Sequence, residues 1–117
     1  TKKIIKDASK NGFTWPNSNK CFYKIEEELK ELKVAIKTKN ISNIKEELGD
    51  LLFTIHCYSE MKKLNITRIL ADANYKFERR FKKLQKIAKS KKIILKEASL
   101  SVKKELWKKA KKEVDLS

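Results

Sequence analysis

The sequence predicts an all-α protein, a bundle of helices, on three observations. Only two glycines and one proline occur in 117 residues, which argues against a turn-rich all-β fold. Apolar residues make up 40% of the chain and are spread along its length, so the chain is expected to fold rather than to stay disordered. In four long segments these apolar residues recur every three or four positions, which is the period of one face of an α-helix.

The first half of the chain is expected to form one short helix and two long ones. The short helix covers residues 2–10 and ends before Gly12, because glycine readily takes the left-handed conformation of a helix C-terminus. A loop follows over 13–19. A long helix is expected to end at about Thr38, with Asn17, Ser18 and Asn19 as candidate N-caps, and the next helix is expected to begin near Ser42. Their apolar stripes are predicted to lie in the core: Phe22, Ile25, Leu29, Leu32 and Ile36, then Ile44, Leu48, Leu51, Leu52, Ile55 and Tyr58.

The second half is expected to form two further helices. One begins at Asn65 or Thr67 and ends at about Ser90, and the other begins at Ser99. The residues predicted to point inward are Ile66, Leu70, Ala73, Phe77, Phe81, Leu84 and Ala88 on the first of these helices, and Leu100, Val102, Leu106, Trp107 and Ala110 on the second.

Length and charge bound the kind of protein. We expect residues 1–117 to form a single domain, because the chain has room for one core and little more. The net charge of +15 would ordinarily suggest nucleic acid as a partner, but 27 of the 30 basic residues are lysines. Proteins that recognise phosphates and base edges usually do so with arginine, so nucleic acid is not the favoured partner.

Cysteine usage and hydropathy exclude other classes. Cys21 and Cys57 are not part of a Cys-x-x-Cys motif, and the chain holds one histidine, so neither a zinc site nor a disulfide scaffold is indicated. The longest apolar run, 51–55, is too short to span a bilayer, and no signal peptide is recognisable. A cytoplasmic protein without a membrane partner is the expectation. The start at Thr1 is compatible with a chain that continues upstream.

Acidic residues are concentrated in one interval of this basic chain. Seven of its fifteen acidic residues fall in 24–50. Among them, Glu28 pairs with Glu31, and Glu47 pairs with Asp50, each at a spacing of three residues that puts both carboxylates on one face of a helix. A single pair of this kind is usual on a solvated helix. Two helices folded back on each other would bring the two pairs together.

Four facing carboxylates would repel one another, so such a site must take up protons or bind a cation. Carboxylate oxygens without neighbouring His or Cys ligands favour Mg²⁺, or Mn²⁺, over zinc. Because protein-bound Mg²⁺ commonly keeps positions open for substrate phosphates, the carboxylates indicate phosphate chemistry.

Four blocks of sequence resemble the MazG family of nucleoside triphosphate pyrophosphohydrolases. They are the Glu-x-x-Glu and Glu-x-x-Asp pairs, the segment Gly12-Phe13-Thr14-Trp15-Pro16-Asn17, the segment Glu46 to Phe53, and the segment Ala73 to Phe81. They occur in the family's order and cover nearly everything from Gly12 to about Lys112, and the resemblance is to the C-terminal type of MazG domain.

The resemblance implies a function and a set of site residues. Members of the family hydrolyse nucleoside triphosphates to the monophosphate and pyrophosphate, as in house-cleaning of the nucleotide pool, and they do so as α-helical dimers. By resemblance the Mg²⁺ ligands are Glu28, Glu31, Glu47 and Asp50, and the residue expected to orient the attacking water is Glu27. The positions expected to contact nucleotide are Lys24, Glu27, Lys76, Arg80, Trp107 and Lys111. A homodimer is expected, with Trp107 and Lys111 near the shared groove.

Some alternatives stay open at this stage. Trp15 and Pro16 are expected to pack their loop against the bundle, and contact of Trp15 with a base is the second interpretation. Gly49 costs about 1 kcal/mol relative to alanine inside a helix, so either close helix packing or ligand access is expected to require it. Asn43 stands where some members carry a basic residue, which would alter affinity or base preference. For the whole chain the alternative is a non-catalytic basic module that binds nucleic acid or a protein partner.

Overall fold

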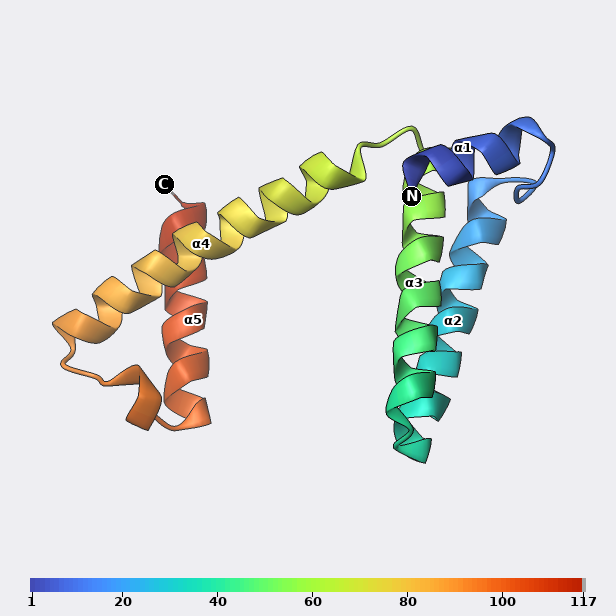
Figure 1. The fold of residues 1–117 in the computed structure, drawn as a ribbon. Coiled ribbons are helices and arrows are strands. Elements are labelled where there is room, and N and C mark those ends of the chain that lie inside the picture. Colours follow the sequence, from blue (N-terminus) through green and yellow to red (C-terminus); the bar gives the residue numbers. More distant parts are fainter. Residues whose placement is uncertain (117) are drawn as a thin grey trace. The chain divides into compact units, whose positions relative to one another are not determined.

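The computed structural model describes residues 1–116, and these residues form helices with no β-strand among them. None of these helices combines the length and apolar character that crossing a bilayer requires. The prediction of an all-α protein is confirmed. The helices are α1 (Lys2–Lys10), α2 (Ser18–Thr38), α3 (Ile41–Met61), α4 (Ile66–Ser90) and α5 (Leu100–Asp115), with a short 3-10 helix, η1, at Leu95–Glu97 (Figure 1).

The helix starts follow from capping side chains. Asn17 accepts a hydrogen bond from the Lys20 amide at 3.0 Å, as expected for the start of α2. Ser99 caps α5 in the predicted way. Helix α3 begins earlier than predicted, because Asn40 rather than Ser42 takes the extended N-cap conformation.

Two compact units divide the chain, one from Thr1 to Thr67 and the other beginning at Arg68. In the first unit, α2 and α3 form an antiparallel hairpin, and α1 packs on α3 (Figure 1). The loop between α1 and α2 begins at Gly12, whose φ of 77° lies in the left-handed region that glycine favours. That a single domain spans the chain stays a prediction.

The buried seam of α2 is not the apolar stripe predicted from its sequence. Cys21, Glu28 and Ala35 are buried, and they recur every seven residues. Phe22 is 47% exposed and Ile36 53% exposed. The reason is geometric: within the first unit α3 is the main helix that packs on α2, and it covers a narrow seam that runs beside the apolar stripe.

The second unit has its core between the last turns of α4 and helix α5. Leu84, Ile87 and Ala88 of α4 pack with Leu106 and Ala110 of α5. The predicted inward positions nearer the start of α4 are wrong for this unit, because its buried cluster does not reach them: Leu70 is 61% exposed and Phe77 56% exposed. The predicted inward residue Leu100 is likewise exposed.

Candidate metal centre

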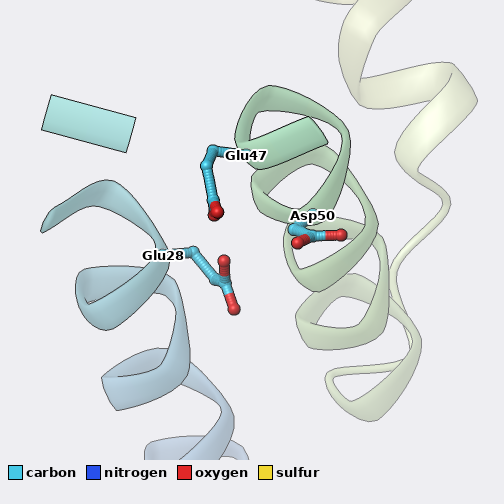
Figure 2. Close-up of side chains that lie close together, drawn as sticks. All are labelled: Glu28, Glu47 and Asp50. Carbon is cyan, nitrogen blue, oxygen red and sulfur yellow. The ribbon is translucent and has the colours of Figure 1, made fainter. Parts of the chain in front are cut away.

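Three carboxylates meet between α2 and α3. Glu28 comes from the buried seam of α2, and Glu47 and Asp50 come from adjacent turns of α3 (Figure 2). Each offers an oxygen that lies within 4.8 Å of the oxygens offered by the other two. The hairpin therefore brings together carboxylates from both predicted pairs, as expected from folding the two helices back on each other.

Two oxygens of this cluster lack the partners that buried polar atoms normally have. The Oε2 atoms of Glu28 and Glu47 are buried, and neither has a hydrogen-bond partner among the described residues. A buried polar atom without a partner costs free energy, and for a charged group the cost is larger. The cluster is therefore short of positive charge or of hydrogen-bond donors.

The electrostatics of Glu28 support this conclusion. Burial raises the pKa of its carboxyl above the usual range, Lys24 opposes the rise through a hydrogen bond, and Glu31 adds to it. In the absence of a cation, burial and Glu31 thus disfavour the ionised form of Glu28, and Lys24 favours it.

Lys24 is the cation that the structure places against Glu28. Its Nζ lies 3.1 Å from Glu28 Oε1 and 3.5 Å from Glu27 Oε1, and the hydrogen bond to Glu28 raises the pKa of Lys24. The side chain of Glu27 is 59% exposed. It is linked to the cluster by Lys24, which contacts both Glu27 and Glu28. Because Lys24 engages Oε1 of Glu28, it leaves Oε2 without a partner.

Glu31 follows Glu28 by one turn on α2 and is exposed. Its side chain lies close enough to Glu28 to raise that residue's pKa, although it is not one of the three carboxylates that converge. Its role as a fourth ligand stays a prediction.

The other predicted contacts belong to the second unit. Arg80 Nη2 donates to both carboxylate oxygens of Asp115, at 2.9 and 3.1 Å. Trp107 packs against Phe77, with ring centroids 5.4 Å apart, and against the buried cluster. Lys76 and Lys111 are exposed. Their proposed contacts with a nucleotide stay predictions.

Sequence reasoning missed the ion pair between Arg80 and Asp115. The two residues are 35 positions apart, and no local periodicity relates them. The sequence signal for this ion pair was Asp115 at the end of α5, and a single aspartate at the end of a helix does not indicate a partner.

Gly49 lies next to Asp50 on α3, and packing among the residues that the structure describes does not require a glycine there. A Cβ atom built at this glycine would meet no atom within 4 Å. Of the two explanations predicted for Gly49, close packing is therefore absent within the described residues.

The donor set suits a hard divalent cation. Glu28, Glu47 and Asp50 offer oxygens alone, with neither histidine nor cysteine among the three. Oxygen-only sites with carboxylate charge match Mg²⁺, Mn²⁺ or Ca²⁺ and do not match the nitrogen and sulfur preference of zinc. A cation here would also satisfy the two unpartnered oxygens, so the residues present fit such a group.

Comparison with known proteins identifies relatives of this chain. The sequence profile of the MazG nucleotide pyrophosphohydrolase domain matches residues 17–85. The nucleoside triphosphate pyrophosphohydrolase/pyrophosphatase MazG of Thermotoga maritima is 38% identical over 110 residues, which are 94% of this chain and 42% of that protein. The nucleoside triphosphate pyrophosphohydrolase of Escherichia coli K12 is 30% identical over 119 residues, covering 97% of this chain and 44% of that protein. The chain thus spans less than half the length of these relatives.

Replacing Glu28 by glutamine should stabilise the metal-free protein, because it removes a charge from a cluster of like charges and keeps the side-chain shape. We expect the unfolding temperature in EDTA to rise by roughly 3–8 °C, the shift that about 1 kcal/mol produces in a domain of this size. Millimolar Mg²⁺ should raise the unfolding temperature of the parent chain and leave that of Glu28→Gln unchanged.

The matched control is Glu46→Gln, an exposed carboxylate of α3 outside the cluster. It should keep the response to Mg²⁺. An equal Mg²⁺ response in Glu28→Gln and in the parent chain would remove Glu28 from the cation site.

Proposed function

Because the chain belongs to the MazG nucleotide pyrophosphohydrolase family, we propose that it hydrolyses nucleoside triphosphates to the monophosphate and pyrophosphate. The observation that carries the proposal is the cluster of Glu28, Glu47 and Asp50 with two buried oxygens that lack partners. A cluster that only stabilised the fold would be expected to pair these oxygens. Removal of altered nucleotides from the cellular pool is the role that this activity would serve.

Mg²⁺ is the proposed cofactor, with Mn²⁺ as a substitute. Glu28, Glu47 and Asp50 would hold it, with Glu31 as the fourth ligand. When bound, the ion would supply Lewis-acid stabilisation of phosphate charge and activation of water. The residues of the chain would disfavour softer metal ions such as zinc, because they offer oxygen donors alone.

The reaction is an in-line displacement at the α-phosphorus. A water oxygen forms the new bond to phosphorus, the bond from the α-phosphorus to the bridging oxygen of the β-phosphate breaks, and pyrophosphate leaves with that oxygen. Glu27 is the residue proposed to orient the water and accept its proton. It adjoins Glu28 in the sequence, and its side chain is exposed enough to meet substrate.

Positive charge for the triphosphate would come from Lys24, Lys76, Arg80 and Lys111. Lys24 is already held at the cluster by its ion pair with Glu28. Arg80 is pre-oriented by Asp115, which engages one of its terminal nitrogens. A guanidinium has five N–H donors, so such a pair leaves others free to bind phosphate. Trp107 is the proposed aromatic contact of the nucleotide.

A homodimer is the proposed assembly, and α2 and α3 offer the face for it. Beside their buried seam, both helices expose large apolar side chains at helical spacing. Surfaces of this kind are uncommon on a monomer and typical of obligate interfaces. The residues of the exposed face are Leu29 (43% exposed), Ile36 (53%), Leu48 (45%), Leu52 (54%) and Ile55 (37%).

Glu47→Gln and Asp50→Asn should each lower pyrophosphate release by at least about 100-fold, which corresponds to roughly 2.7 kcal/mol of lost transition-state stabilisation. The expected cause is the loss of a cation ligand with side-chain shape preserved. The assay is pyrophosphate release from a panel of normal and damaged triphosphates, with Mg²⁺ and with EDTA.

A variant that retains activity near that of the parent chain would exclude its residue from the metal site. If the parent chain releases no pyrophosphate from any triphosphate, yet binds nucleic acid with an affinity that falls steeply with salt, the non-catalytic alternative is correct.

Lys76→Ala and Arg80→Ala should each lower kcat/KM by about 10-fold, because each removes a positive charge proposed to bind phosphate. Their Mg²⁺-dependent rise in unfolding temperature should match that of the parent chain. Asp115→Ala breaks the ion pair and keeps the guanidinium, so it should lower kcat/KM less than Arg80→Ala does. Lys86→Ala, an exposed lysine of the same helix, is the control for Lys76. Parent-like kinetics in both test variants would refute the phosphate assignment.

Leu52→Glu should convert a dimer into a monomer, because it places a charge in the exposed apolar face of α3. Light scattering coupled to size exclusion measures the mass. Val34→Glu is the control, because Val34 is 61% exposed on α2 yet lies away from the proposed face. A parent chain that is a stable monomer and still hydrolyses triphosphates would refute the dimer.

A further inference from the structure

Two cysteines lie in the α2–α3 hairpin, one on each helix. Both are free thiols, and both are buried: Cys21 completely, and Cys57 with 4% of its surface exposed. The Cys21 thiol donates a hydrogen bond at 3.8 Å to the backbone carbonyl oxygen of Thr54, so it reaches across the seam to α3. Cys57 follows Thr54 by three residues, which is about one helical turn. Cys21 therefore packs directly on the turn of α3 that leads to Cys57.

The register of the hairpin sets the two cysteines opposite each other. Glu28 faces Asp50 across the seam in the carboxylate cluster (Figure 2). Two helical turns take about seven residues, so a step of seven stays on nearly the same face of a helix. In an antiparallel hairpin, seven residues back along α2 match seven residues forward along α3. The first step leads from Glu28 to Cys21, and the second leads from Asp50 to Cys57.

A contact and an electrostatic effect agree with this register. Cys21 contacts Thr54, which lies seven residues after Glu47. Glu28 meets Glu47 in the cluster, so the contact at Cys21 repeats the contact at Glu28 two turns away. In addition, burial raises the pKa of the Cys57 thiol to about 11, and the charge of Cys21 adds to the rise. The two sulfur atoms are therefore near enough to influence each other.

The separation of two packed helices suits a disulfide at such a position. Helix axes pack about 8–10 Å apart, and Cα atoms lie on a cylinder of radius about 2.3 Å. Two Cα atoms that point straight at each other are then roughly 3.5–5.5 Å apart, and offset pairs are farther apart. Disulfides join Cα atoms that are about 4.4–6.8 Å apart. A bond between Cys21 and Cys57 therefore does not require the helices to separate.

An apolar cavity of about 510 Å³ gives small molecules access to Cys57. The cavity lies between α1, the loop after it, and α3, and its lining includes Ile5, Trp15, Phe53 and Cys57. Cys21 does not line the cavity. A small uncharged oxidant such as hydrogen peroxide can enter a space of this size and character, and it meets Cys57 first.

We infer that Cys21 and Cys57 form a site of reversible oxidation, at which a peroxide joins α2 to α3 by an intrachain disulfide. First, the Cys57 sulfur attacks one oxygen of hydrogen peroxide. An S–O bond forms, the O–O bond breaks, and the departing hydroxide takes the thiol proton and leaves as water, so that Cys57 is a sulfenic acid. Then the Cys21 sulfur attacks the Cys57 sulfur. The S–S bond forms, the S–O bond breaks, and the hydroxyl leaves with the Cys21 proton as a second water. The two thiols lose the two electrons that the peroxide gains.

The disulfide ties the end of the hairpin that lies opposite its loop. Helices α2 and α3 are joined between Thr38 and Ile41, whereas Cys21 lies near the start of α2 and Cys57 near the end of α3. A cross-link at this end restricts the unfolded chain and so stabilises the folded hairpin. The bond uses the same register as the carboxylate cluster, so the cluster stays in place. The inference concerns the hairpin alone and does not depend on the proposed function.

Peroxide treatment of the whole chain tests the inference. The thiolate is the reactive form, and the pKa of Cys57 is raised, so the treatment is carried out over hours at mildly alkaline pH. The mass of the chain should fall by two hydrogen atoms, and neither cysteine should then react with an alkylating reagent in denaturant. The unfolding temperature should rise by roughly 10 °C, and dithiothreitol should reverse the rise. The response of the unfolding temperature to Mg²⁺ should match that of the reduced chain.

The matched control is the double variant Cys57→Ser, Ser59→Cys, which keeps two thiols and the composition of the chain. Ser59 is as buried as Cys57, with 5% and 4% of their surfaces exposed. It lies two residues further on, about 200° around the helix and away from Cys21. The control should form no intrachain disulfide and show no rise in unfolding temperature. Cys21→Ala, which lacks one partner, should behave in the same way.

Three results of peroxide treatment would each overturn the inference: two cysteines that still react with the alkylating reagent, a sulfinic acid at Cys57 without a disulfide, or a disulfide between two chains. An intrachain bond that forms equally in the double variant would show that the seam does not select the pair. Loss of the Mg²⁺ response on oxidation alone would show that the bond shifts α2 against α3, contrary to the shared register.

Discussion

A buried carboxylate in the seam between two helices is the constraint on which the first unit depends. Glu28 occupies a position of α2 between Cys21 and Ala35 that would otherwise hold an apolar side chain, and it faces Glu47 and Asp50. Burial disfavours the ionised form of Glu28, and Lys24 contacts only Oε1 of its carboxylate, so Oε2 has no partner among the described residues. The hairpin must therefore tolerate local repulsion, which is a cost that a purely structural seam would avoid by using leucine. Such costs are characteristic of functional sites.

The sequence predicted the cluster because two short-range rules were sufficient for it. A spacing of three residues fixes which carboxylates share a helix face, and the apolar pattern of the two helices predicts that they fold back on each other. Helix starts were predictable for the same reason, since Asn17 and Ser99 act on amides three residues away. The start of α3 was displaced by two residues because Asn40 and Ser42 are both good N-caps, and propensity alone does not rank them.

Other features depended on contacts that no local rule fixes. The stripe containing Phe22 and Ile36 has the period of a core face, yet within its unit α2 packs mainly on α3 and buries the adjacent seam. The ion pair of Arg80 with Asp115 joins residues that are 35 positions apart. The apolar cavity that Phe13 lines is likewise formed by segments distant in the sequence, α1 with the loop after it and α3. Periodicity shows that a face is apolar. It does not show whether that face meets the same chain, a ligand or a second copy.

Gly49 illustrates how such exposed features can be interpreted. A glycine inside a helix costs about 1 kcal/mol relative to alanine, and here no other packed atom of the described residues lies within 4 Å of where a Cβ would stand. The cost therefore has no compensation in packing within the described residues. Gly49 adjoins Asp50 and lies one turn from Phe53, so its bare backbone stands beside the cluster and near the apolar cavity. A group that approaches α3 from outside the chain, either the substrate or a second copy, is what would benefit from the missing side chain. The rings of Phe13 and Phe53 are exposed as well, so within the first unit α3 offers surface that this unit alone does not cover.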